Sequence, residues 1–136
     1  MESIIVKVYW NEQNFECVWA CEDFGTVIVT HKTLDGLKLA FEDAVKMQIA
    51  DMLSDGEDVP QWLCDGRYSI VYDLEVSAIL RDAEQYTTMA AISKVSGINS
   101  KQLSHYANSV KRPRAEQRKR IIDALHSIGE KFMAIC

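Results

Sequence analysis

The sequence predicts an α+β protein in which a β-β-β-α-β domain, residues 1–75, precedes an all-α domain, residues 76–136. Strand-like alternation of apolar side chains is confined to the first 75 residues, and only helix-like spacing follows it. Residues 1–75 contain 5 Lys/Arg and 15 Asp/Glu, a balance of −10, whereas residues 76–136 contain 10 and 5, a balance of +5. The net charge of −5 therefore hides two segments of opposite sign, which indicates two functions.

Three strands are expected at the start of the chain, over residues 4–10, 15–21 and 26–30. The polar segments NEQN and EDFG separate them and have the composition of turns, so we expect an antiparallel meander. The apolar side chains expected on one face of the first two strands are Ile4, Val6, Val8, Trp10, Phe15, Cys17, Trp19 and Cys21.

A long helix is expected after the third strand. Thr33 has the chemistry of an N-cap, and Asp35 in the first turn favours the helix dipole. The acidic segment 54–66 is expected to be a loop, and residues 68–74 to form a fourth strand that returns to the sheet. The apolar face expected on the helix comprises Leu34, Leu37, Phe41, Val45, Ile49 and Met52.

Four helices are expected in the second domain. The first is VSAILRDA (76–83), and the second, MAAISKVS, is capped by Thr88 and ended by Gly97. Asn99 or Ser100 caps the third, KQLSHYAN, and the fourth begins after Pro113. The apolar stripe of the fourth helix belongs to the core alone or also to a dimer contact; it consists of Ile121, Leu125, Ile128, Phe132 and Ile135.

Residues 88–113 have the pattern of a helix-turn-helix. Gly97 allows a left-handed backbone between two short helices without a steric penalty. Short polar side chains are expected to face outward from the second helix, as in a recognition helix that enters the major groove. The residues expected to fill the interior are Ile92, Val95, Ile98, Leu103 and Tyr106.

A basic cluster follows the second helix of this pattern and would hold phosphate groups without reading sequence. It comprises Lys111, Arg112, Arg114, Arg118, Lys119 and Arg120. A solvated helical hairpin is the alternative to DNA binding. The predicted DNA-binding residues are Thr88, Ser100, Lys101, Gln102, Ser104, His105, Asn108, Lys111, Arg112 and Arg114.

The segment GINSKQLSHYANSVKRP (97–113) resembles the recognition-helix region of Cro/repressor-type helix-turn-helix domains. The upstream half, a short meander followed by T-x-x-x-LKLAFEDAV, resembles HicB-type antitoxins of bacterial toxin–antitoxin pairs. This resemblance implies a partial ribonuclease-H-like sheet and helix followed by a DNA-binding domain. It also implies a function: the first domain would neutralise a small basic RNA-cleaving HicA-type toxin, and the second would repress the chain's own operon by binding operator DNA.

An acidic domain is suited to attract a cationic partner such as a basic toxin. Helix-turn-helix proteins commonly dimerise so that two recognition helices reach successive major grooves, and we therefore expect a homodimer or a higher homo-oligomer. The alternative is a helix-turn-helix repressor whose first domain dimerises or senses a ligand through Trp10, Trp19, Trp62 and the tyrosines.

Other functional classes find less support in the sequence. A nuclease needs carboxylates that converge on metal ions, and Asp23, Asp35, Asp43, Asp51 and Asp73 show no convergent spacing, so we expect neither an enzyme nor a cofactor. No apolar run approaches the roughly 20 residues that span a bilayer. The N-terminus lacks the pattern of a secretory signal, and the four cysteines lack zinc-like spacing. A cytoplasmic protein with reduced thiols is the expectation.

Overall fold

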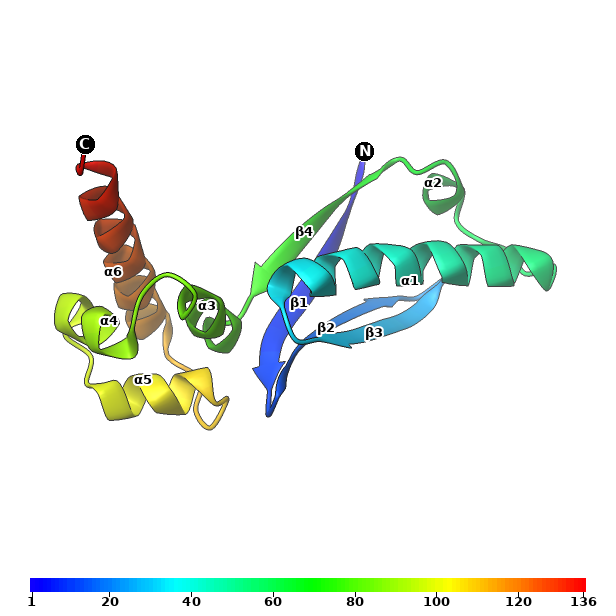
Figure 1. The fold of residues 1–136 in the computed structure, drawn as a ribbon. Helices are drawn as coiled ribbons and strands as arrows, with labels where there is room; N and C mark the ends of the chain where they lie inside the picture. Colours follow the sequence, from blue (N-terminus) through cyan, green and yellow to red (C-terminus); the bar gives the residue numbers. More distant parts are fainter. The chain divides into compact units, whose positions relative to one another are not determined.

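The computed structural model describes residues 1–136 and divides into two compact units, Met1–Glu75 and Val76–Cys136. The protein is of the predicted α+β class, with a four-stranded sheet in the first unit and six helices along the chain (Figure 1). None of the helices combines the length and the apolar character that crossing a bilayer requires.

The sheet of the first unit has the strand order β3-β2-β1-β4. Strands β1 (Glu2–Asn11), β2 (Asn14–Cys21) and β3 (Gly25–His31) form the predicted antiparallel meander. Strand β4 (Tyr68–Leu74) returns to the sheet, as predicted, and pairs with β1 in parallel. The sheet is therefore mixed, because β4 runs parallel to β1 whereas β1, β2 and β3 pair antiparallel.

Helix α1 (Leu34–Ser54) lies along one face of this sheet (Figure 1). The predicted cap is confirmed, since the Thr33 hydroxyl accepts a hydrogen bond of 3.0 Å from the Gly36 N–H. The predicted alternation in β1 is also confirmed. The side chains of the sheet and of α1 that are fully buried between the two layers are Ile4, Val6, Val8, Cys17, Leu37, Phe41 and Val45.

The expected acidic loop at 54–66 contains a short helix, α2 (Gln61–Cys64), which the sequence prediction missed. Pro60 is the N-cap residue of α2, with φ of −50° and ψ of 133°. Leu63 is buried, and the ring of Trp62 makes edge-to-face contacts with Trp19 and Tyr68 at centroid distances of 6.5 and 6.1 Å. Contacts with the sheet therefore hold this segment in place.

The second unit consists of three short helices and one long one. Helices α3 (Val76–Ala83), α4 (Met89–Ser96) and α5 (Ser100–Ala107) have eight residues each, and α6 (Ala115–Met133) has 19. Their common core is formed by Val76, Leu80, Ile92, Ile98, Leu103, Tyr106, Ala107 and Ile121.

Two predictions about this core are wrong. Val95 is 41% exposed instead of filling the interior. Phe132 and Ile135 are 61% and 73% exposed, and Ile135 lies beyond the end of α6. Eight-residue helices span only about 12 Å, so they cover only the first half of a helix more than twice as long. The core contact of α6 ends near Leu125 and Ile128, which are only partly buried against the core.

Candidate nucleic-acid interface

The connection between α4 and α5 is a tight turn at Gly97. Gly97 has φ of 76°, the left-handed region predicted for it, and its N–H donates to the Ser93 carbonyl oxygen. The Ser93 hydroxyl donates to the Ile98 carbonyl oxygen at 2.6 Å, which closes the turn from the other side. Helix α5 then begins at once, so the two helices meet through a short and internally bonded segment.

Of the two candidate caps for α5, the structure selects Asn99. Its side-chain oxygen accepts a hydrogen bond of 2.8 Å from the Gln102 N–H. Ser100 consequently lies in the first turn of the helix, with its side chain exposed. Thr88 plays the corresponding role at the start of α4, where its hydroxyl accepts a hydrogen bond of 3.1 Å from the Ala91 N–H.

The inner face of α5 is as predicted. Leu103 is fully buried and Tyr106 is 3% exposed. The phenol oxygen of Tyr106 accepts a hydrogen bond of 2.8 Å from the Gln102 side chain, so that amide is held along the helix. Gln102 is therefore a weaker candidate for base contact than its position in the sequence suggested.

The outer face of α5 presents three exposed polar side chains, Ser100, Lys101 and Ser104. Asn108, which was predicted to belong to this set, is engaged within the protein. Its side-chain nitrogen donates to the Ser104 carbonyl oxygen at 2.9 Å, and its side-chain oxygen accepts from the Arg81 guanidinium. The predicted outward position of His105 is wrong in part, because this residue is half-buried and its Nδ1 is buried without a hydrogen-bond partner.

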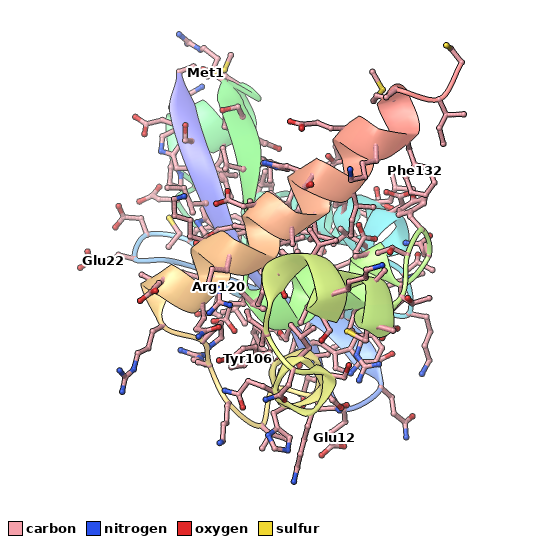
Figure 2. The ribbon with its side chains drawn as sticks, turned by 90° about the vertical axis from the view of Figure 1, so that its left-hand side faces the viewer. Met1, Glu12, Glu22, Tyr106, Arg120 and Phe132 are labelled. Atoms are coloured by element: carbon pink, nitrogen blue, oxygen red, sulfur yellow. The ribbon has the colours of Figure 1, made fainter.

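The predicted basic cluster divides into two groups. Lys111, Arg112 and Arg114 are exposed on the segment between α5 and α6. Two members on α6 have partners within the protein: Lys119 forms an ion pair of 2.9 Å with Asp123, which raises the pKa of Lys119. Arg120, labelled in Figure 2, donates from Nε and Nη2 to the Ser96 carbonyl oxygen at 3.2 and 2.8 Å. Arg120 thus caps the C-terminal end of α4 by donating to its last carbonyl group.

The first unit has an uncovered sheet face opposite α1. Ile5, Ile28 and Val71 are exposed there by 57%, 61% and 50%, and they come from β1, β3 and β4. Ile5 lies beside Val71 in the register of the sheet, and Val18 lies beside Ile28. The same face also carries Lys7 and Asp73, which form an ion pair of 3.1 Å, so exposed apolar side chains stand there beside charged ones. Exposed apolar side chains that lie next to one another are typical of a surface that binds another protein.

The aromatic residues of the first unit mostly pack on one another. Trp19 contacts Phe24, Phe41 and Trp62 at centroid distances of 5.7 to 6.5 Å. Trp10 packs edge-to-face on Phe15 at 5.1 Å, and its indole N–H donates to the Glu12 carbonyl oxygen. These contacts are those of a core and its rim.

The acidic and sulfur-containing side chains do not assemble into a metal site: no group of three or more His, Cys, Asp or Glu is placed to hold an ion. All four cysteines are free thiols. Burial raises the pKa of the Cys17 thiol to about 11, so this group stays protonated at neutral pH.

Comparison of this chain with protein-family models, with curated proteins and with solved structures finds no match. The function proposed below rests on the geometry of α4, α5 and the basic segment that follows them, and on the charge of residues 1–75.

Proposed function

We propose that the second unit binds DNA as a helix-turn-helix domain, with α5 as the recognition helix. The observation that supports this most strongly is the left-handed turn at Gly97 between two eight-residue helices. Ser100, Lys101 and Ser104 on the outer face of α5 are exposed and are residue types that recognition helices use to hydrogen-bond base edges in the major groove. The basic segment next to them supplies charge for the phosphate backbone through Lys111, Arg112 and Arg114.

For the two units together we propose an antitoxin of the HicB type, which neutralises a small RNA-cleaving HicA-type toxin and represses its own operon as a homodimer or higher homo-oligomer. Three features of the first unit support this reading. It has the β-β-β-α-β order that the resemblance to a partial ribonuclease-H-like domain implies. Its 5 Lys/Arg and 15 Asp/Glu give a charge of −10, which attracts a cationic toxin. Its uncovered sheet face, on which Ile5, Ile28 and Val71 are exposed, offers a surface for a protein partner.

A second candidate is a helix-turn-helix repressor whose first unit dimerises. The uncovered face around Ile5, Ile28 and Val71 favours this candidate too, because a second copy can bury such a face as well as a toxin can. The ligand-sensing form of this candidate has less support, since Trp10 and Trp19 are used in packing.

The experiment that tests the proposal uses the full chain and two probes: a duplex from the region upstream of its own gene, and the small basic protein encoded by the adjacent reading frame. We expect the chain to bind the upstream duplex more tightly than a scrambled duplex of the same composition. We also expect it to bind the basic protein and to stop that protein from cleaving RNA. Binding of DNA without binding of the basic protein would support the repressor, and binding of neither would disprove both candidates.

A further inference from the structure

Two arginines from flanking helices close the C-terminal ends of α4 and α5. Arg120 of α6 donates twice to the carbonyl oxygen of Ser96, the last residue of α4, at 3.2 and 2.8 Å. Arg81 of α3 donates from Nε to the carbonyl oxygen of Ala107, the last residue of α5, at 3.1 Å. A further N–H of Arg81 donates to the side-chain oxygen of Asn108. Each helix of the turn thus has an arginine at the same end.

The chemistry of a helix end explains why arginine suits these positions. The last carbonyl groups of a helix lack partners within the helix, and they carry the negative end of its dipole. A guanidinium is always charged, and its planar fork of N–H groups reaches two acceptors at once. At the end of α5 two different nitrogens of the fork donate to a backbone oxygen and to a side-chain oxygen, whereas lysine has a single nitrogen without this fixed geometry.

These contacts hold the C-terminal end of α5 and the turn that precedes α5. At the start of α5, the Arg120 guanidinium lies over the turn, since its Nη2 would be 2.8 Å from a Cβ atom placed on Gly97. At the other end, Arg81 holds Ala107 and Asn108, and Asn108 in turn donates to the Ser104 carbonyl oxygen at 2.9 Å. The outer face of α5 is therefore presented at an angle that α3 and α6 determine.

We propose that Arg81 and Arg120 are positioning residues for DNA recognition: they set the orientation of α5 and do not bind phosphate. Asn108 contributes to this positioning by accepting a hydrogen bond from Arg81, and it does not contact a base. This inference rests on the proposed DNA-binding function. It also divides the arginines of the second unit by role, because Arg114 lies exposed on the segment before α6 and remains a phosphate-binding candidate.

Salt dependence distinguishes a positioning residue from a phosphate contact. The logarithm of the DNA-binding constant falls with the logarithm of salt concentration by roughly 0.9 per phosphate that the protein neutralises. A phosphate contact therefore contributes to this slope, and it contributes equally on any sequence. A positioning residue contributes to binding of the correct sequence alone, because only that complex depends on how α5 is oriented.

The test compares Arg81→Gln and Arg120→Gln with Arg114→Gln in the full chain. Fluorescence anisotropy measures binding to the upstream duplex and to a scrambled duplex over a range of salt concentrations. For the first two variants we expect a loss of about tenfold on the upstream duplex, the size of one good base contact, with an unchanged slope and unchanged binding of the scrambled duplex. For Arg114→Gln we expect weaker binding of both duplexes and a slope reduced by roughly 0.9.

A double-mutant cycle tests the role of Asn108. If Asn108 acts through Arg81, Asn108→Ala weakens binding of the upstream duplex in the parent chain and adds little in the Arg81→Gln background. Additive losses would show an independent base contact and would overturn this part of the inference. Arg81→Lys serves as the conservative variant: it keeps the charge but lacks the fork, so we expect it to leave the loss in place.

Circular dichroism checks that each variant is folded at the assay temperature, and Arg120→Lys replaces Arg120→Gln if the latter unfolds. A slope reduced by about one for Arg81→Gln or Arg120→Gln would identify a phosphate contact and overturn the inference. Equal losses on both duplexes would show a general structural role and overturn it as well. If the parent chain binds neither duplex, the proposed function itself fails, which is a different result from binding that the two substitutions leave unchanged.

Discussion

Gly36 has a specific neighbour that explains a glycine in the first turn of α1. A Cβ atom at this position would overlap the imidazole of His31. That ring is held in place, because its Nδ1 accepts a hydrogen bond of 3.1 Å from the Thr33 N–H at the helix start. The glycine therefore makes room for a side chain that fixes the junction between β3 and α1.

Substitution of Gly36 tests this explanation. Alanine normally stabilises a helix interior by about 1 kcal/mol relative to glycine. We expect Gly36→Ala to be destabilising by about 1 kcal/mol instead, because the imidazole must leave its hydrogen bond. Gly129→Ala in α6 is the matched control, since a Cβ there meets only open space, and it should be stabilising. Urea unfolding measures both variants, and a gain in stability for Gly36→Ala would contradict the role given to His31.

The thiols of the protein differ in accessibility, and this difference predicts a pattern of alkylation. Burial raises the pKa of Cys17 to about 11, while Cys64 and Cys136 are exposed. We expect iodoacetamide at pH 8 to modify Cys64 and Cys136 quickly and to leave Cys17 unmodified until the protein unfolds. Mass spectrometry of the digested protein reads out each site. Modification of Cys17 at the same rate as Cys64 would show that the sheet and α1 do not protect it.

The raised pKa of Cys17 also has a consequence for stability at high pH. The folded state disfavours the thiolate, so the contribution of the neutral thiol is complete below the ordinary pKa of 9.0 and is lost as pH rises towards 11. The free energy of unfolding should therefore decrease over this interval. In a Cys17→Ala variant, which has no ionisable group at this position, the decrease should be smaller.

At the scale of single elements, the start of α5 separates a residue that forms the helix from one that is available to bind. Asn99 is the cap, and Ser100 is the first exposed residue of the helix. Asn99→Ala should cost about 1 kcal/mol of stability, because a first-turn N–H loses its acceptor. Ser100→Ala should change stability by less than about 0.5 kcal/mol and weaken binding of the upstream duplex. Thermal unfolding and anisotropy give the two readouts, and the opposite assignment of effects would exchange the two roles.

Elements with local signals could be predicted from the sequence, and those that depend on distant contacts could not. The alternation of Ile4, Val6 and Val8 and the cap at Thr33 are properties of neighbouring residues. Helix α2 has four residues, too few to show a period, and Trp62 holds it by contacts with the sheet. In the candidate interface, the turn at Gly97 could also be predicted, because a glycine between two helical patterns is a local signal. The hydrogen bonds of Arg81 and Arg120 join residues that are 26 and 24 positions apart, so no local sequence pattern predicts them.

At the scale of the whole molecule, the two units differ in charge, in secondary structure and in the kind of surface they expose. The first unit has a four-stranded sheet with exposed apolar side chains on its uncovered face and a charge of −10, from 5 Lys/Arg and 15 Asp/Glu. The second has only helices and a charge of +5, from 10 Lys/Arg and 5 Asp/Glu. We propose a protein partner for the first unit and a nucleic acid for the second on the basis of these differences, so the two proposed activities should be separable by substitution.

Ile28→Lys on the uncovered sheet face and Arg114→Gln before α6 provide that separation. Ile28 is 61% exposed on the edge strand β3, so lysine is tolerated there, but a positive charge among the exposed apolar side chains of the contact should weaken binding of the basic protein by about tenfold or more. Leu39→Lys is the matched control. Leu39 is 65% exposed on α1, so this substitution adds the same charge to the same unit but away from the uncovered sheet face. Isothermal titration should show the loss for Ile28→Lys alone, with DNA binding unchanged, while Arg114→Gln weakens DNA binding and leaves the basic protein bound. Equal losses for Ile28→Lys and Leu39→Lys would mean that overall charge, and not the sheet face, determines binding. Loss of both activities in one folded variant would contradict the division of roles between the units.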